Sequence, residues 1–470
     1  MARIMDGPTR CHDAMNPQEL RGLTGLVALY ATRMLGLFMV LPVLALEAEH
    51  YRGVSPALVG VALGAYGLTQ GLLQIPLGLL SDRVGRRVVI AGGMAVFCAG
   101  SVLAAMTESI HGLILGRALQ GAGAVASAVM ALLADLTTEE HRTRAMAAVG
   151  GSIGLAFAAA MVLGPLLAAH WGLAAIFWLT ALLAALGIAL VVFWIPAPAA
   201  PSRLAASESL AVPRLLGRVL SHGQLLRLDF GVFALHLAQM ASWVAVPTLL
   251  AERHHLPLER HWLFYLAAMG GGFFLMIPLV IHGERRGRLK PVLLFGIAAL
   301  MAGDGLLAMA GERFFLFAAG ALAFFVGFNL LEAVLPSLVS KIAPAGTRGT
   351  AMGVFSSSQF LGAFAGGALG GLVAHGSGLE DVFWLAAAVA ALWLGVAATM
   401  APPPNWGTVV VDLAEYPAAA AVERLRECCK GVEEITLFPE ERLLYLKVDK
   451  SRFSREELDA LLREGAAGRP

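Results

Sequence analysis

Hydrophobic residues recur in long runs along most of this chain, and short polar segments separate the runs. Each run is about as long as the roughly 20 residues that a helix needs to cross a bilayer. Backbone amides in lipid must be paired within their own segment, so each run is predicted to be a helix. The predicted spans are 22–46, 56–80, 88–107, 109–135, 145–169, 173–195, 228–250, 261–282, 290–310, 313–340, 350–374 and 380–400.

Two polar segments divide this pattern. Residues 196–227 are rich in Pro, Ala and Ser and then basic, which predicts a cytoplasmic linker between two groups of six spans. After Pro404, strand-like and helix-like runs alternate in the order βαββα, at 408–413, 418–430, 432–438, 443–448 and 454–463. This order predicts a small α+β domain of the ferredoxin-like type. The predicted parts are a cytoplasmic N-terminal segment, a six-helix bundle, the linker, a second six-helix bundle and a cytosolic ferredoxin-like domain, at 1–21, 22–195, 196–227, 228–400 and 405–470.

Composition and charge support a membrane protein and orient it. Of 470 residues, 58% are hydrophobic and 14% charged, whereas soluble proteins are about 25% charged. The net charge of +1 favours no nucleic-acid partner, and the four cysteines have no metal-ligand spacing. Arginines gather in alternate loops such as 83–87 and 285–288, which predicts a multi-pass protein of a bacterial inner membrane with both termini cytoplasmic.

One loop pattern occurs in both halves. The order acid, Arg, any residue, Gly, Arg is found at Asp82–Arg86 and again at Glu284–Arg288. Repeated halves are typical of transporters that bind their solute near the bilayer midplane, between the repeats. The sequence therefore predicts an all-α membrane protein of twelve transmembrane helices in two six-helix repeats, followed by the small α+β domain.

The first copy of this loop resembles motif A of the major facilitator superfamily. The residues that carry the resemblance are Gly78, Asp82, Arg83, Gly85, Arg86 and Arg87. The resemblance implies that the loop latches the two halves in an outward-facing state, with Asp135 as the partner of Arg86. The simpler alternative is a loop whose charges only set the orientation in the membrane.

Two further patterns resemble motifs of this family. Leu113, Arg117, Gln120, Gly121 and Gly123 match motif B, which implies a role for Arg117 in proton coupling. A structural arginine that forms internal hydrogen bonds is the alternative. The Gly164-Pro165 pair resembles motif C of antiporters, although alanines at 160, 168 and 169 stand where glycine is usual. A kink for helix packing explains this pattern as well as antiport does.

Several polar residues fall inside predicted spans. Glu332 is the best candidate for a proton-binding carboxylate, since proton uptake would remove its charge and shift the balance between inward and outward states. A hydrogen bond to Asn329 or to an arginine is the alternative, and a satisfied interior histidine is an alternative for His236. The proton-coupling candidates are Arg117, Glu332, Arg33 and His236. The candidates for the solute cavity are Phe38, Gln70, Asn329, Trp243 and Phe360.

The motifs, the repeat and the C-terminal domain together resemble the YajR-type subgroup of this superfamily. The resemblance implies a secondary transporter with proton-coupled, multidrug-type efflux of small amphipathic or drug-like solutes by alternating access. We expect a monomer that uses the proton gradient and no cofactor. A metabolite importer or symporter is one alternative, and a membrane sensor that acts through residues 405–470 is another. No nucleotide-binding loop, zinc motif or nucleophile elbow is present, so an enzyme is not predicted.

Overall fold

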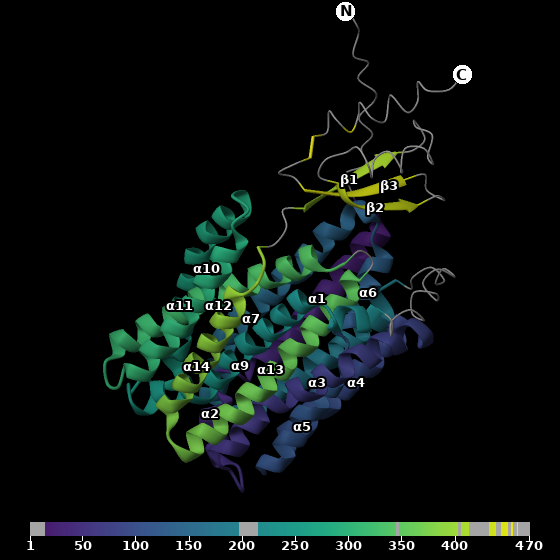
Figure 1. Cartoon of the computed structure of the whole chain (residues 1–470). Helices are drawn as coiled ribbons and strands as arrows, with labels where there is room; N and C mark the ends of the chain where they lie inside the picture. The colour runs from purple at the N-terminus through teal and green to yellow at the C-terminus, as the bar shows by residue number, and fades with distance from the viewer. Residues whose placement is uncertain are drawn as a thin grey trace, which may run out of the picture. The chain divides into compact units, whose positions relative to one another are not determined.

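The structure is a computed structural model (Figure 1). It describes residues 15–196, 215–344 and 347–402 and, beyond these, 406–412, 432–438, 443–449, 453–454 and 458. The chain divides into a helical unit that ends at Met400 and a smaller unit that comprises 283–290 and the residues from Ala401 onward. The predicted helix at 418–430, most of the one at 454–463 and most of the linker lie outside the described residues.

The first half of the helical unit contains seven α-helices among the described residues. They are α1 (Pro17–Met39), α2 (Leu44–Glu47), α3 (Pro56–Val84), α4 (Arg86–Met106), α5 (Ile110–Ala122), α6 (Ala126–Leu136) and α7 (Glu139–Ala189). A 3₁₀ turn, η1 (Ala48–His50), and a π-helical turn, η2 (Leu190–Trp194), follow α2 and α7. The first helix begins before the predicted 22 because Asn16 and Glu19 form a reciprocal capping box.

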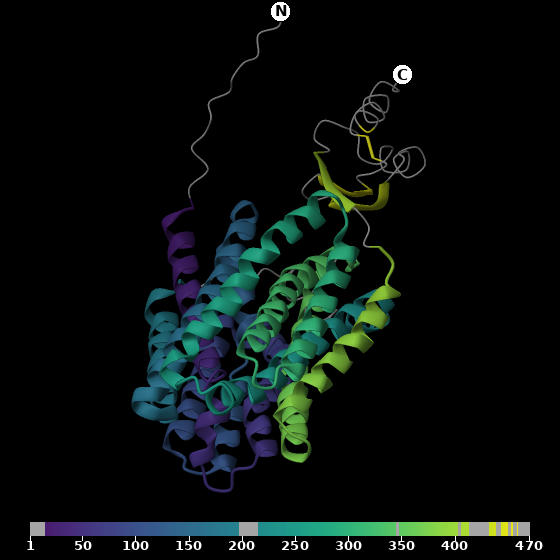
Figure 2. The same ribbon diagram turned by 90° about the vertical axis from the view of Figure 1, so that its left-hand side faces the viewer.

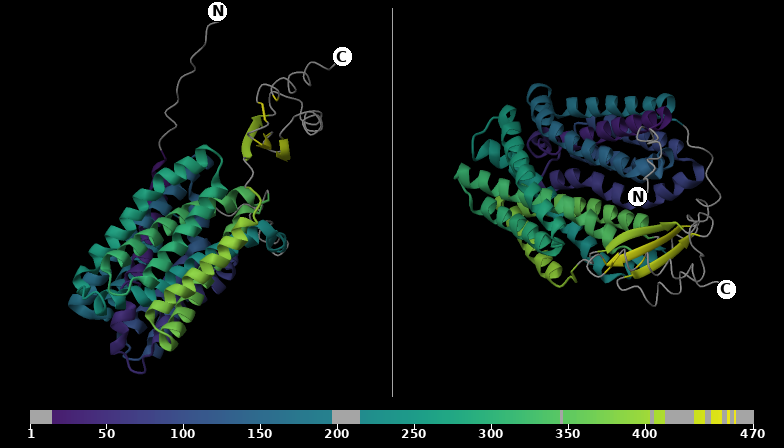
Figure 3. Two further views of the ribbon diagram at one scale, coloured as in Figure 1. Left: turned by 60° about the vertical axis from the view of Figure 1, so that its left-hand side comes forward. Right: turned by 90° about the horizontal axis from the view of Figure 1, so that it is seen from above.

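The second half holds α9 (Gly223–Glu252), η3 (Leu258–Arg260), α10 (His261–Arg285), α11 (Leu289–Met309), α12 (Phe314–Ile342), α13 (Arg348–Gly376) and α14 (Leu379–Ala398). Figures 2 and 3 show the two halves as neighbouring groups of helices, the first purple to blue and the second teal to green. The described start of α9 lies four residues before 227, the predicted end of the linker.

The predicted fourth span, 109–135, is found as one candidate membrane span, Ile110–Leu136, but it is not one continuous helix. It breaks at Gly123–Val125 into α5 and α6. A side chain at Gly123 would come within 2.3 Å of the backbone oxygen of Gly93. Irregular backbone at membrane depth is tolerated where protein groups surround it, and the carbonyl of Gly123 accepts a hydrogen bond from Arg33 at 3.4 Å.

The predicted count of twelve spans is not confirmed by length and apolar composition, which identify ten candidate spans among the described residues. One candidate covers 51 residues, Arg144–Trp194, and is interrupted at Gly172, whose φ of 73° favours glycine. This break coincides with the predicted boundary between the fifth and sixth spans. The helix α13 is rich in glycine and serine and is not among the ten.

The two halves meet along α3 and α13, a contact that we call the seam. Side chains added at Gly60, Gly64 or Gly67 of α3 would come within 2.8 Å of backbone atoms of α13. Small residues allow such close approach of helices in a bilayer. On the opposite side, α13 packs equally closely on α9, because Gly362 and Gly366 of α13 contact the backbone of α9. The helix α13 therefore belongs to the second half and also holds the first.

The smaller unit contains an antiparallel three-stranded sheet. Its strands are β1 (Trp406–Asp412), β2 (Val432–Phe438) and β3 (Leu443–Asp449), in the order β1-β3-β2. The strands lie where the sequence predicts them, and the buried Leu446 and Val448 place apolar side chains on one face of the central strand. The ferredoxin-like assignment also requires two helices that lie outside the described residues, so it stays a prediction.

Candidate functional site

The motif A loop is held by a small ion-pair cluster. The left-handed φ of Gly85, 110°, turns the chain sharply between α3 and α4. Arg86, at the first position of α4, forms an ion pair of 2.8 Å with Asp82 and a second with Asp135 on α6. The predicted contact between Arg86 and Asp135 is therefore confirmed, and it ties α3, α4 and α6 together.

Other residues of this loop also hold helices of the first half in place. Arg87 donates hydrogen bonds from Nη2 to the carbonyls of Val191, at 2.7 Å, and Val192, at 3.0 Å. Carbonyls in the last turn of a helix lack helical partners, which makes them natural acceptors. Gly78 packs against the side chain of Ser127, whereas Arg83 is exposed.

Buried hydrogen bonds surround Arg33 in the first half. Its side chain is 1% exposed, and Nη2 donates to the hydroxyl of Tyr66 and to Oε1 of Gln70, both at 2.8 Å. Gln70 donates in turn to Gln74 at 3.1 Å. Nε and Nη1 of Arg33 have no hydrogen-bond partner among the described residues. Gln70, which is predicted to line the solute cavity, thus binds the arginine and links it to Gln74.

Arg117 forms a second buried cluster. Its Nη1 donates to Oε1 of Gln120 at 2.9 Å, and Gln120 donates to the hydroxyl of Ser101 at 2.8 Å. Its guanidinium carbon also lies 5.5 Å from the ring centre of Tyr66, within cation–π range. These contacts are those of the structural alternative, and no carboxylate among the described residues bonds to Arg117.

A histidine and a carboxylate meet in the second half. Nε2 of His236 on α9 lies 3.4 Å from Oε1 of Glu332 on α12 and 2.8 Å from Nε2 of Gln359 on α13. Its Nδ1 lies 3.1 Å from the carbonyl oxygen of Val232. The side chain of His236 is 10% exposed and that of Glu332 is 38% exposed. We call His236, Glu332 and Gln359 the histidine–glutamate cluster.

The alternative hydrogen bond between Asn329 and Glu332 is not present. Asn329 donates instead to the backbone oxygen of Met269 at 3.3 Å. Sequence spacing could not show the contact with His236, because it depends on how α9 and α12 pack. Gln359 was recognisable only as a polar residue inside a span.

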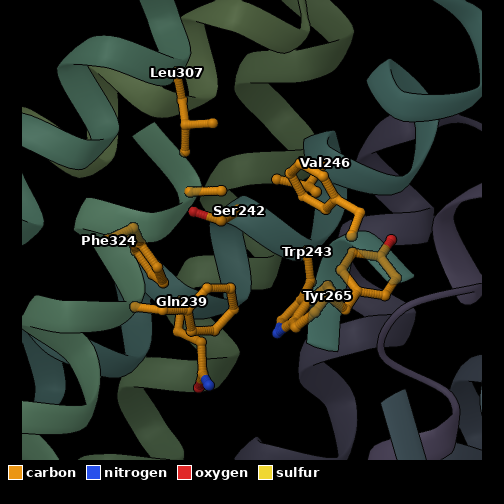
Figure 4. Close-up of a pocket in the computed structure, with 10 residues that line it drawn as sticks. Gln239, Ser242, Trp243, Val246, Tyr265, Leu307 and Phe324 are labelled. Atoms are coloured by element: carbon orange, nitrogen blue, oxygen red, sulfur yellow. The ribbon is translucent and has the colours of Figure 1, made fainter. Parts of the chain in front are cut away.

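The aromatic candidates do not share one cavity. Phe38 packs edge-on against Phe157, and Phe360 packs edge-on against Tyr66 across the seam. Trp243 lines a small pocket between α9, α10, α11 and α12 (Figure 4). The pocket is lined by Gln239, Ser242, Trp243, Val246, Phe264, Tyr265, Leu307, Ala321, Phe324 and Phe325.

The buried arginines and the buried aspartates of the described residues lie in different halves. The first half holds Arg33 and Arg117, each 1% exposed, whereas the second half holds Asp304, which is fully buried, and Asp229, which is 7% exposed. Asp304 was not predicted from the sequence, although an acidic residue inside an apolar run was a visible signal. No group of three or more metal-ligating side chains occurs among the described residues.

Comparison with known proteins identifies the family. The model of the Major Facilitator Superfamily matches residues 26–228 and 228–421. The chain is 45% identical over 452 residues to the inner membrane transport protein YajR of Escherichia coli (strain K12), which covers 96% of this chain and 99% of that protein. It is 29% identical to the multidrug resistance protein MdtH of Aeromonas hydrophila, over 75% of this chain and 87% of that one.

Solved structures agree on the fold. The human organic anion transporter MFSD10 (TETRAN) aligns with a TM-score of 0.58 at 22% identity, covering 81% of this chain and 100% of that chain. An auto-inhibited peptide transporter of the POT family aligns with a TM-score of 0.60 at 17% identity, covering 80% and 95%. The matched relatives are membrane transporters and not enzymes. This chain is a membrane-embedded transporter that belongs to the Major Facilitator Superfamily.

Proposed function

We propose that this transporter exports small amphipathic or drug-like solutes from the cell in exchange for protons. The observation that carries the proposal is the histidine–glutamate cluster, where a partly exposed carboxylate lies beside a buried imidazole. Ionisable side chains within a membrane-spanning bundle cost stability, so those that are present usually serve a function. The relative named a multidrug resistance protein supports the proposed solute class and the outward direction.

The geometry of the cluster favours exchange of one proton. The contact of Nδ1 with the Val232 carbonyl places the ring proton there, so Nε2 accepts a hydrogen bond from Gln359. The lone pair of Nε2 and a charged Glu332 then repel each other. A proton bound by either group removes this repulsion and forms a hydrogen bond or an ion pair between them.

Protonation would bias the position of α13. Gln359 lies two residues from Ser357, whose carbonyl oxygen would be 3.1 Å from a side chain added at Gly71 of α3. When Nε2 of His236 is protonated it can no longer accept from Gln359, and α13 loses one contact with α9. Proton binding and opening of the seam would thereby share one structural element, as coupled transport requires.

The motif A cluster would act at the cytoplasmic ends of these helices. Asp82, Arg86 and Asp135 lie where α3 and α6 end, and we propose that they stabilise the state in which those ends meet α13. This proposal places both termini in the cytoplasm. It also assigns the sheet of the smaller unit to a cytosolic ferredoxin-like domain.

The test is solute-driven proton movement in proteoliposomes that contain the purified full chain. Candidate solutes come first from a growth screen under toxic compounds, with and without the protein. The proposal expects a pH change on addition of an exported solute, abolished by Glu332→Gln and unchanged by Glu49→Gln, which alters an exposed acid in the 3₁₀ turn η1. Equal proton movement by Glu332→Gln and wild type would remove the coupling claim, and counterflow that runs only inward would favour an importer.

A further inference from the structure

Asp304 is the most completely buried acidic residue described in this chain. It lies on α11 at 0% exposure, on the same buried face as Leu300 and Leu307, at 0% and 2%. Neither carboxyl oxygen has a hydrogen-bond partner among the described residues. Packing beside it is tight, because a side chain on Gly303 would come within 2.5 Å of the backbone nitrogen of Phe324.

These surroundings exclude a charged Asp304 in this conformation. Burying an unpaired carboxylate in an apolar interior costs more free energy than binding a proton, so the group becomes neutral instead. The helices that meet α11 at the pocket carry Asp229 and His236 (α9), Tyr265 (α10) and Glu332 (α12) in their apolar stretches. None of these side chains forms a hydrogen bond or ion pair with Asp304. The carboxyl therefore holds a proton.

The small pocket reaches the same face of α11. Leu307, one helical turn from Asp304, lines it, and Figure 4 shows Leu307 and Ser242 on one side and Trp243 and Gln239 on the other. The indole nitrogen of Trp243 is buried and has no hydrogen-bond partner among the described residues. The pocket is lined mainly by apolar groups and Asp304 does not itself line it, so the fully buried carboxyl group stays dry in this conformation.

We propose that Asp304 is a second proton-binding site of the transporter. The carboxylic acid gives its proton to a water molecule, which leaves a carboxylate and a hydronium ion, and a later hydronium ion restores the acid. The proton leaves when the helices around Leu307 separate enough to hydrate the carboxyl group. This inference rests on the proposed proton coupling and adds to it a site outside the histidine–glutamate cluster.

Chemical labelling of the full-length protein tests the site without relying on transport. Dicyclohexylcarbodiimide reacts with protonated carboxyl groups in apolar surroundings, so it should modify Asp304 at neutral pH, as read by mass spectrometry. Asp304→Asn should lose that label and Glu332→Gln should keep it. Labelling should weaken at high pH and should change when a transported solute is added, which a merely structural acid would not show. An unlabelled Asp304 across the pH range, or a label that ignores both pH and solute, would overturn the proposal.

Proton counting in proteoliposomes gives the second readout. If each carboxyl site carries one proton, Asp304→Asn should lower the protons moved per solute about two-fold while solute binding persists. Leu307→Phe should slow the labelling by filling the pocket and leave the number of protons unchanged. An unchanged proton count in Asp304→Asn would sink the inference alone. A wild-type protein that moves no proton would sink the proposed function, and labelling would still decide whether Asp304 binds one.

Discussion

The two ends of the seam between α3 and α13 differ sharply. At one end, which we call the closed end, Gly60 and Gly64 of α3 lie so close to Gly367 and Phe364 that an added side chain would strike backbone atoms at 2.1 Å and 2.8 Å. At the other end, the open end, Gly349 and Gly353 of α13 have no described atom within 4 Å of such a side chain. The contact stops near Ser357, while the run of small residues continues.

Glycine alone therefore does not mark a contact between helices. At the closed end glycine is required by backbone approach in the present conformation. At the open end the same residue type has no neighbour, which is what a surface that packs only in the opposite state would show. The histidine–glutamate cluster reaches α13 through Gln359, close to the point where closed turns to open. We therefore expect proton binding to move the seam.

The largest effect is expected from Glu332→Gln, which removes the group proposed to switch the two ends. Coupling free energies between sites are about 1–3 kcal/mol, or about 5- to 150-fold in an equilibrium. The variant should lose solute-driven proton movement, and its seam should no longer respond to pH. Fluorescence of a pH dye inside proteoliposomes measures the loss. Normal coupling in this variant would show that the histidine–glutamate cluster does not control the two ends of the seam.

The closed end can be broken with Gly64→Leu. Its side chain would meet the backbone of Phe364 at 2.8 Å, and overpacking costs about 1–3 kcal/mol. The closed end should separate, with transport falling accordingly and cysteine accessibility rising along α3. Gly154→Leu is the matched control, since no described atom lies within 4 Å of its added side chain. If both variants behave alike, close packing at Gly64 has no special role.

The open end makes the opposite prediction with Gly353→Leu. The added side chain meets no described neighbour in the present conformation. The free energy of unfolding should therefore change by no more than about 0.5 kcal/mol, and the melting temperature should change little. Transport should nevertheless fall, because the larger side chain would oppose closure of this end in the other state. Transport and thermal unfolding measured on one preparation check this. Full transport by Gly353→Leu would show that α13 does not pack on α3 there.

A smaller effect is expected from Arg86→Ala at the motif A loop. Its ion pairs with Asp82 and Asp135 are partly exposed, and such pairs contribute about 0.2–1 kcal/mol each. Arg86→Ala should lower, by a few-fold, the population of the opposite state, in which the open end of the seam is in contact. Cross-linking of α3 to α13 at that end measures that population. Arg83→Ala is the control, because it removes the same charge from an exposed position of the loop. Equal effects would leave charge alone as the function of the loop.

The smallest effect on the seam should come from deleting 405–470. The described sheet of that segment belongs to a separate compact unit, and such units can fold and act on their own. Transport should stay within about two-fold of the full chain. Initial rates in proteoliposomes provide the measurement, with the protein amount matched. Complete loss of flux would favour the alternative in which the C-terminal domain carries the function.

The sequence predicted the parts of this account that depend on order along the chain. The apolar runs gave most helices, the break near Gly172 was placed correctly, and the partner of Arg86 was found because the motif fixes the loop and the end of the next inner helix. Strand positions in the C-terminal segment were also predicted, since alternating patterns there are short and separated by turns.

The parts that depend on helix rotation and packing were out of reach. The contact of His236 with Glu332 joins α9 and α12, and no spacing rule connects residues 96 positions apart. The break after Ala122 escaped because apolar composition continues across it. Asp304 could have been found by inspection of its run, but its lack of a partner could not.

Distances at both ends of the seam, measured on one protein, show whether the two ends open and close in opposition. Spin labels at Val84 and Gly349 report on the open end, and labels at Pro56 and His375 report on the closed end; all four positions are exposed. Across changes of pH and solute, double electron–electron resonance should show one distance shortening as the other lengthens, with Glu332→Gln fixed in one state. Distances that stay constant, or that change in the same direction at both ends, would contradict the account.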